Sequence, residues 1–372
     1  MQPQHKLYGL DHLRALAILM VFIYHYGILF DAPEWVISVG KFGWTGVDLF
    51  FVLSGYLIAS QLFSKIDAGR KISFPEFFIK RFFRIIPAYL VVLALYVFLP
   101  SFREREALAP LWKYLTFTQN IGLDVARQGT FSHAWSLCIE EQFYFVLPLL
   151  LIALVYYKAF KKSYWLLLLL FLLGFAARIY AWYVPLAPYF NTDEFAIYWS
   201  KWIYYPTFSR LDGLLVGVSI AALLQFKPAV KEKLAPYGNW LLIASLVFFT
   251  SAFLLSADQR SFTASVFGFP LVDIGYGFVV LAAITPSCFL YKRGLKLTTS
   301  IAILSYAIYL IHKITIHLSQ QQFEKWGVET DSNLMLLLCI ITTVLAAILL
   351  RYSIEKPFLR IRDKLLAVKK AT

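Results

Sequence analysis

Ten apolar stretches separated by short polar loops constrain this 372-residue chain more than any other feature of its sequence. Most of them have the length at which a helix crosses a bilayer, and a backbone inside lipid must satisfy its own hydrogen bonds. Only 15% of the residues are charged and 60% are hydrophobic, which excludes an ordinary soluble domain. The sequence therefore predicts an all-α integral membrane protein with about ten transmembrane helices. The predicted spans cover approximately residues 11–30, 45–63, 85–100, 134–157, 163–183, 205–225, 239–256, 262–285, 297–318 and 333–352.

Two of these spans are predicted to begin with a proline in the first turn, where proline is tolerated. Pro87 opens the third span and Pro206 opens the sixth. Residues 73–84 precede the third span and combine aromatic with basic side chains, a composition typical of a helix in the membrane interface. We therefore expect an interfacial helix over 73–84, followed by a short third span.

The basic residues are distributed unequally over the two sides of the predicted bundle. The side that holds both termini carries 23 lysines and arginines, whereas the opposite loops carry eight. Cytoplasmic loops hold an excess of basic residues, so both termini are predicted to be cytoplasmic. This topology accounts for the net charge of +13 without a nucleic-acid partner. The predicted domains are a ten-helix membrane domain over 1–357 and a basic cytoplasmic tail over 358–372. The eight outer basic residues are Lys41, Arg103, Arg105, Lys113, Arg127, Lys201, Arg260 and Lys325.

The first span carries two ionisable residues, Arg14 and His25, within an otherwise apolar stretch. They are eleven residues apart, about three helical turns, so both side chains leave the same face, roughly 16 Å apart along the axis. A helix in lipid buries such groups at a cost and turns them towards a protein interior or a wet cavity. The pair therefore predicts a polar track along the inner face of this helix.

Further ionisable residues lie in the outer parts of other spans, near the predicted depth of His25. Each alone is ordinarily read as a buried ion pair, but their occurrence in several helices predicts a shared cavity that opens outward. They are Asp48, Glu140, Glu141, Arg210, Asp212, His312 and Lys313. On the cytoplasmic side, Arg81 and Arg84 lie three residues apart on one helical face. They are either ordinary topology-setting charges or a clamp for phosphate, whose oxygens match the guanidinium fork.

Six segments of the chain, spread over about 10–357, resemble the acyltransferase 3 family of membrane-bound O-acyltransferases. The resemblance implies a ten-helix fold and transfer of an acyl group, usually acetyl from acetyl-CoA, to a hydroxyl of a sugar or other acceptor outside the cell. It implies functional roles for Arg14, His25, Arg81 and Arg84. The segments are RALAILMVFIYHY, GVDLFFVLSGYLI, FFIKRFFRIIPAY, FSHAWSLCIEEQFYF, PTFSRLDGLLVG and SYAIYLIHK. Other recurrent polar positions of the family are matched by Ser54, Asp48, Ser136, Glu140, Arg210 and Asp212. The chain departs from the family pattern after His312, where Lys313 and Ile314 replace an aromatic residue and a proline, which argues against a catalytic role for His312.

Residue chemistry and resemblance together predict an acyl-CoA-dependent O-acetyltransferase of the bacterial inner membrane. Arg14, Arg81 and Arg84 would bind the phosphates of acetyl-CoA, and His25 would act as general base. Either Asp48 or Glu140 would orient His25, and an acyl-histidine intermediate is the alternative to direct transfer. The residues predicted to bind the acceptor are Ser54, Ser136, Arg210 and Asp212. The predicted partners are acyl-CoA, membrane lipid and an extracytoplasmic sugar: a polysaccharide, a lipopolysaccharide sugar, a lipid-linked precursor or a small glycoside.

Two other classes of function remain open from the sequence. Intramembrane ionisable residues also suit a proton-coupled transporter or flippase, although the chain has no internal repeat of the kind that transporters often show. A membrane sensor without turnover is the other alternative. No metal site is predicted, because Cys138, Cys288 and Cys339 lie in or beside apolar spans without metal-ligand spacing. Only about twenty residues follow the last span. We therefore expect the membrane domain to finish the transfer itself or to pass the acyl group to another protein.

Overall fold

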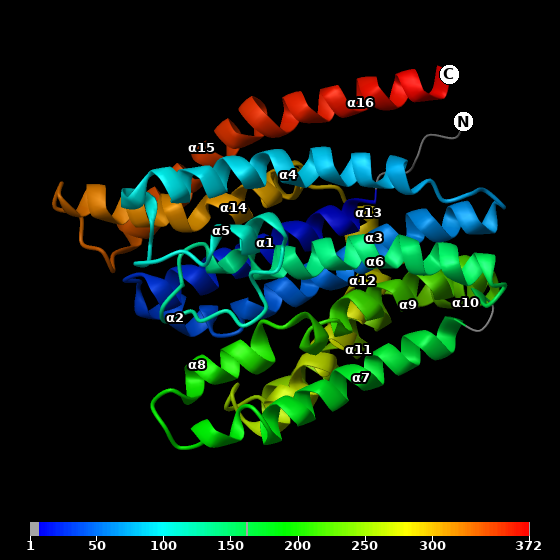
Figure 1. The fold of residues 1–372 in the computed structure, drawn as a ribbon, viewed down its shortest axis with the longest axis horizontal. Coiled ribbons are helices and arrows are strands. Elements are labelled where there is room, and N and C mark those ends of the chain that lie inside the picture. The colour runs from blue at the N-terminus through cyan, green and yellow to red at the C-terminus, as the bar shows by residue number, and fades with distance from the viewer. Residues whose placement is uncertain (1–6, 161–162, 372) are drawn as a thin grey trace.

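The computed structural model describes residues 7–160 and 163–371, and every regular element in these ranges is helical (Figure 1). Lys6, Lys161 and Lys162, which contribute to the predicted charge bias, lie outside the described residues. The long helices are α1 (Tyr8–Leu29), α3 (Gly46–Asp67), α4 (Phe74–Phe98), α6 (Trp135–Tyr156), α7 (Ser163–Tyr183), α9 (Asp212–Phe226), α11 (Gly238–Leu255), α12 (Phe269–Ala283), α14 (Lys296–Glu324), α15 (Asn333–Leu350) and α16 (Lys356–Ala371).

Short helices and turns connect these rods. The short α-helices are α2 (Glu34–Gly40), α5 (Leu111–Leu115), α8 (Phe195–Trp199), α10 (Pro228–Leu234) and α13 (Phe289–Lys292). Short 3₁₀ turns are η1 (Gly43–Thr45), η2 (Pro100–Phe102), η3 (Ser132–Ala134), η5 (Ala187–Tyr189), η7 (Thr207–Ser209) and η8 (Ala235–Tyr237). Single π-helical turns are η6 (Ser200–Tyr204), η9 (Ala264–Gly268) and η10 (Arg351–Glu355).

The class of fold predicted from the sequence is confirmed. Nine helices of the described ranges are long and apolar enough to cross a membrane, and α9 is a tenth, shorter apolar helix. With 15 residues α9 is about 22 Å long. It is shorter than the predicted span because the helix begins at Asp212, whereas the span was expected to open at Pro206. Pro206 instead precedes the η7 turn. Figure 1 shows that α16 ends at the same end of the bundle at which α1 begins. The segment predicted as a basic tail is helical as far as Ala371.

The expected break before the third span is wrong. A single helix, α4, runs without interruption from the predicted interfacial segment through Pro87, which lies inside it. The reason is the start signal at Ser73, whose side chain accepts a hydrogen bond from the Glu76 backbone N–H at 3.3 Å. Pro75 occupies the first turn, where its missing N–H costs nothing. The basic residues of 73–84 therefore belong to the same continuous helix as the third span.

Close contact between α3 and α9 forms the centre of the bundle. A Cβ atom added to Gly55 would lie 2.2 Å from the Leu214 carbonyl oxygen, and one added to Gly217 would lie 2.2 Å from the Val52 carbonyl oxygen. Small residues let helix backbones approach in this way inside membranes, where packing drives association. At the periphery, α7 leaves Leu172 about half exposed, as expected for a helix facing lipid. The central helices α1, α3, α4, α6 and α14 carry the polar residues described next.

Candidate functional site

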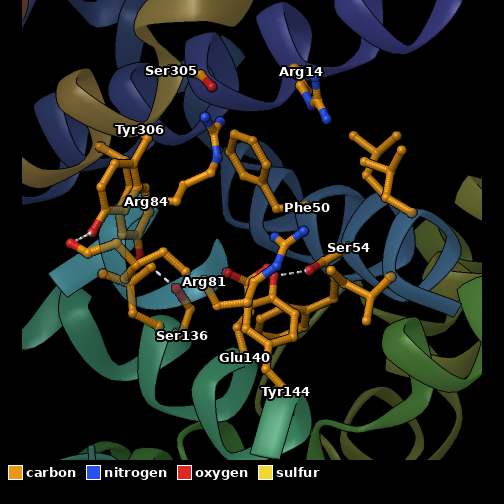
Figure 2. Close-up of a pocket in the computed structure, with 17 residues that line it drawn as sticks. Arg14, Phe50, Ser54, Arg81, Arg84, Ser136, Glu140, Tyr144, Ser305 and Tyr306 are labelled. Atoms are coloured by element: carbon orange, nitrogen blue, oxygen red, sulfur yellow. Dashed lines mark hydrogen bonds between the residues drawn. The ribbon is translucent and has the colours of Figure 1, made fainter. Parts of the chain in front are cut away.

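An inner cavity of about 140 Å³ lies among α1, α3, α4, α6 and α14 (Figure 2). Six of the predicted site residues line it, together with Tyr144, Tyr306 and Tyr309. These six are Arg14, Ser54, Arg81, Arg84, Ser136 and Glu140. The Arg14 side chain is 32% exposed, so the cavity can be reached from outside the protein. The structure therefore brings all the predicted phosphate-binding residues together in one place.

The positive charge of this inner cavity exceeds its negative charge. Arg14 from α1 and Arg84 from α4 are close enough to interact electrostatically, and Arg14 also interacts with Arg81. The Arg81 guanidinium lies 5.4 Å from the centre of the Tyr144 ring, and its Nε atom is buried without a hydrogen-bond partner among the described residues. Glu140 is the one carboxylate among the described lining residues. Three guanidiniums against one carboxylate form a site that favours an anion, with forks suited to phosphate.

Two hydrogen-bonded pairs of hydroxyls complete the cavity wall. Ser54 hydrogen-bonds Tyr144, and Glu140 interacts with Ser54 and with Arg81. Ser136 Oγ lies 2.6 Å from the Tyr309 hydroxyl, which donates to the His133 carbonyl oxygen at 2.5 Å. Because the Tyr309 proton is committed to that carbonyl, Ser136 donates to Tyr309. These hydrogen bonds among Ser136, Tyr309 and the His133 carbonyl hold the start of α6 against α14.

A second, outer cavity of about 640 Å³ contains His25. His133 and Trp135 also line it, so the segment that contributes Ser136 to the inner cavity contributes its neighbours to the outer one. Tyr309, which lines the inner cavity, packs its ring 5.6 Å from that of His133. A wall that includes the packed rings of Tyr309 and His133 therefore separates the two cavities.

The prediction of one shared cavity at a single depth is wrong, because predicted residues line two different cavities. Glu140 faces the inner cavity and His25 faces the outer one. The physical reason is that helix face, and not depth alone, decides where a side chain points. On α6, Ser136 and Glu140 are four residues apart and share a face, whereas Trp135 points to the other side.

His25 has a different hydrogen-bond partner from those predicted. His312 Nε2 lies 3.0 Å from His25 Nδ1, whereas Asp48 and Glu140 make their contacts elsewhere. His312 Nδ1 faces the carbonyl oxygens of Ile308 and Tyr309 at 3.1 and 2.9 Å, so it must carry a proton. In a neutral ring Nε2 is then an acceptor, and His25 must donate to it from Nδ1. The remaining nitrogen of His25, Nε2, keeps its lone pair.

His133 completes a cluster of three imidazoles. Its ring centre lies 6.0 Å from that of His25 and 5.0 Å from that of His312. The family pattern argued against a catalytic role for His312, and His133 was not among the predicted residues, although the segment SHAW lies among the motifs that carry the family resemblance. Next to His312, Lys313 forms an ion pair with Glu104 at 3.2 Å. Within the described ranges, no group of three or more His, Cys, Asp or Glu residues is arranged to hold a metal ion.

Asp48, Arg210 and Asp212 form buried ion pairs outside both cavity linings. Asp48 Oδ1 accepts a hydrogen bond from Arg210 Nη2 at 2.5 Å, and Asp212 pairs with Arg178. The Arg210 guanidinium also lies 4.0 Å from the centre of the Phe269 ring. These pairs join α3, α7 and α9. Arg178 was not among the predicted residues, although a lone arginine in an apolar stretch is a usable signal.

Comparison with known proteins defines the class. The model of the family described as "Acyltransferase domain" matches residues 7–352, so the chain belongs to this family and the predicted resemblance is confirmed.

Curated relatives are bacterial. The chain is 29% identical over 332 residues to "O-acetyltransferase OatA" of Staphylococcus aureus, covering 84% of this chain and 51% of the relative. It is 29% identical over 337 residues to "Peptidoglycan O-acetyltransferase OatA" of Listeria monocytogenes, covering 85% and 50%. A "Putative O-acetyltransferase" of Staphylococcus aureus is 30% identical over 329 residues, covering 82% and 50%. The chain thus spans about half the length of these relatives. No solved structure shows a significant match. The helices and these relatives identify a multi-pass bacterial membrane protein.

The ion pair of Asp48 yields a prediction that separates a structural from a catalytic carboxylate. Asp48→Asn removes the carboxylate that accepts a hydrogen bond from the buried Arg210 guanidinium, which should lower the stability of the protein by about 3–5 kcal/mol. Thermal unfolding of the detergent-purified variant measures the loss. The matched control is Asp67→Asn on the same helix, whose carboxylate contacts only Gln225 at an exposed position.

The double variant Asp48→Leu with Arg210→Met tests the same pair in a second way. Removing both charges together should restore much of the stability that Asp48→Asn loses. A stable Asp48→Asn protein whose maximal rate alone falls would contradict the structural role and return Asp48 to the catalytic group.

Proposed function

We propose that this chain transfers an acetyl group from cytoplasmic acetyl-CoA to a hydroxyl of a carbohydrate on the outer side of the membrane. One observation carries the proposal: the packed rings of Tyr309 and His133 separate an arginine-rich cavity from a cavity that contains His25. Family membership supports acyl transfer, and the relatives' names support an O-linked acetyl group and a cell-wall carbohydrate. An enzyme that joins substrates from two sides of a membrane needs this arrangement.

The inner cavity is proposed as the donor site. The 3′-phosphate and diphosphate of CoA would add negative charge to Arg14, Arg81 and Arg84, beyond Asp11 at 3.8 Å from Arg14 and Glu140 near Arg81. Guanidinium forks hold phosphate oxygens through paired, charge-assisted hydrogen bonds. From Arg14 to His25 the axis of α1 covers roughly 16 Å, a distance that the extended pantetheine arm would bridge. Ser54, Glu140 and Ser136 would line the path of this arm and orient its amides.

His25 is proposed as the general base. Its Nε2 lone pair, set by the hydrogen bond that Nδ1 gives to His312, would accept the proton of the acceptor hydroxyl. The hydroxyl oxygen forms a bond to the carbonyl carbon of the thioester, and the carbon–sulfur bond breaks. The departing thiolate then takes the proton from His25, so that CoA leaves as the thiol and His25 returns to its neutral form. His312 acts in this scheme as a positioning residue for His25.

The wall between the two cavities must open for the thioester to reach His25. Tyr309 is the side chain that lines the donor cavity and packs against His133 on the acceptor side. We infer that a change of its rotamer, with loss of its hydrogen bonds to Ser136 and the His133 carbonyl, admits the acyl end of the donor. While that network is intact, the two cavities stay apart and water is kept from the thioester.

The proposed topology places the donor cavity and both termini on the cytoplasmic side. The bias of 23 basic residues against eight supports this orientation. The basic end of α16 then lies at the cytoplasmic surface, where it can contact anionic lipid head groups. The domain division into a membrane domain over 1–357 and a tail over 358–372 belongs to this proposal.

A proton-coupled transporter or flippase is the rival function. The two functions differ in what is released: transfer yields free CoA and an acetylated sugar, whereas transport yields flux across a liposome membrane without CoA chemistry. The deciding assay mixes the purified protein, labelled acetyl-CoA and a glycan acceptor, and follows both the label and the thiol. Label that moves to the acceptor supports the proposal. Flux without thiol release contradicts it.

The base and its positioning residue give a second prediction. His25→Gln should lower acetyl transfer by about 10² or more, since it removes the general base. His312→Phe removes the acceptor that holds the His25 tautomer and should lower kcat by at least about tenfold with little change in the KM for acetyl-CoA.

His312→Gln retains a polar acceptor and should recover part of that rate. The control is His317→Gln on the same helix, whose ring contacts Gln321 instead of the cluster. Steady-state kinetics on folded, membrane-inserted protein measure each change. Full activity of His25→Gln would rule out this base, and identical rates for His312→Phe and wild type would remove the positioning role.

The arginines give a third prediction. Arg81→Lys and Arg84→Lys keep the charge that sets topology but lose the planar fork, so each should weaken acetyl-CoA binding by about 1–2 kcal/mol. Isothermal titration calorimetry with acetyl-CoA measures the affinity. Arg70→Lys, an exposed residue of the loop before α4, is the matched control. Wild-type affinity in both lysine variants would mean that these arginines serve topology alone.

A further inference from the structure

Positive charge gathers in the outer cavity although the outer side of the protein is poor in basic residues. Of the eight lysines and arginines in the outer loops, Lys41, Arg105 and Arg260 line this one cavity with His25. They come from three distant parts of the chain: the end of α2, the loop after α4 and the loop before η9. Among its described lining residues there is no aspartate or glutamate. The fold therefore concentrates one sign of charge around the proposed base.

The carboxylates nearest in sequence, which include Glu106 beside Arg105, form no ion pair with these three cations within the described ranges. Glu104, next to Arg105, accepts a hydrogen bond from Lys313 Nζ at 3.2 Å. Asp258 Oδ1 accepts a hydrogen bond from the backbone N–H of Arg260 at 2.9 Å, and this bond stabilises the local turn. Within the described ranges, the side chains of Lys41, Arg105 and Arg260 form no ion pair within 4.0 Å. These three cations remain available to a ligand.

The rest of the cavity adds apolar surface without negative charge. Tyr24, Trp44, Trp135 and Tyr204 line it, and such rings offer broad faces against which a sugar ring can pack. Burial raises the pKa of Tyr204, so its phenol stays uncharged. A cleft with walls of low polarity and charges of one sign focuses the electric field and attracts ligands of the opposite sign. Arginine among these charges suits carboxylate and phosphate oxygens in particular.

We propose that the acceptor is an anionic carbohydrate, one that carries a carboxylate or phosphate group beside the hydroxyl that receives the acetyl group. This inference rests on the proposed function, because it assigns the acceptor to the cavity of His25. Arg105 and Arg260 bind the anionic group, and Lys41 adds to the attraction at the cavity mouth. The anion thereby holds the sugar so that a hydroxyl faces His25 Nε2, and neutral sugars lose this contact.

The experiment compares three probes that share one sugar ring size and differ in charge. Methyl glucoside is neutral, methyl glucuronide carries a carboxylate and glucose 1-phosphate carries a phosphate. Binding of each to the purified full chain is followed by ligand-observed NMR titration. At least one anionic probe should bind about tenfold more tightly than the glucoside, as expected for a charge-assisted contact. The relative affinities of the glucuronide and the phosphate distinguish the two sources of negative charge.

Matched variants test whether the cavity arginines are responsible. Arg105→Gln and Arg260→Gln should each weaken the preferred anionic probe by about tenfold and leave the glucoside unchanged. Arg127→Gln is the control, because Arg127 is also an outer arginine but its side chain is 85% exposed and lines neither cavity. Equal binding of all three probes to wild-type protein would overturn the inference, as would arginine variants that retain full affinity for the anionic probes.

Acetyl-CoA binding and thiol release, measured in the same preparations, separate this inference from the proposed function. Acetyl transfer with equal affinity for neutral and anionic probes would support acetyl transfer and overturn the anionic acceptor. Anion-selective binding that depends on Arg105 and Arg260, without any acetyl transfer, would support the anion site and overturn the proposed reaction.

Discussion

The bilayer core offers no water to a charged side chain, and this constraint separates the structural charges of the protein from those available for function. Asp48 pairs with Arg210, and Asp212 pairs with Arg178, inside the bundle, and these ion pairs join its helices. Arg81, by contrast, faces a cavity in which three guanidiniums meet one carboxylate among the described lining residues. An excess of positive charge that faces a cavity within the bundle indicates an anionic ligand, which is why the proposed donor site is the arginine cavity.

The separation of the two cavities has a mechanistic meaning. In the proposed reaction, a thioester exposed to two aqueous sides at once would hydrolyse, so the wall formed by Tyr309 and the start of α6 would protect the donor. The same segment serves both sides: Ser136 faces the arginines, whereas His133 faces His25. Because the Tyr309 hydroxyl bonds both Ser136 and the His133 carbonyl, loosening one side chain changes both cavities together.

Much of the fold and the gathering of Arg14, Arg81 and Arg84 in one place could be predicted from the sequence, because both depend on local patterns. Apolar length defines the spans, and helical spacing places Arg81 and Arg84 on one face. The errors have two sources: a local start signal whose effect was underestimated, and tertiary contacts that no local pattern encodes. A capping signal at Ser73 carries the helix through Pro87, which a local proline rule does not anticipate.

The partner of His25 could not be predicted, because it depends on contacts between residues far apart in the sequence. Asp48 has the chemistry to orient a histidine, but Arg210, 162 residues away in sequence, takes it. His312 lies 287 residues from His25, and no local pattern encodes that contact. Membership of the acyltransferase family fixes the class of reaction, whereas the direction in which each side chain points requires the folded bundle.

A structure of the protein with a non-hydrolysable thioether analogue of acetyl-CoA tests the central claim most directly. The account predicts that the phosphates contact Arg14, Arg81 and Arg84, that Tyr309 moves aside, and that the acyl carbon lies beside His25, with room for an acceptor hydroxyl about 3–3.5 Å from it. A nucleotide bound in the outer cavity, or an acyl group that remains among the arginines while Tyr309 keeps its hydrogen bonds, would contradict the account.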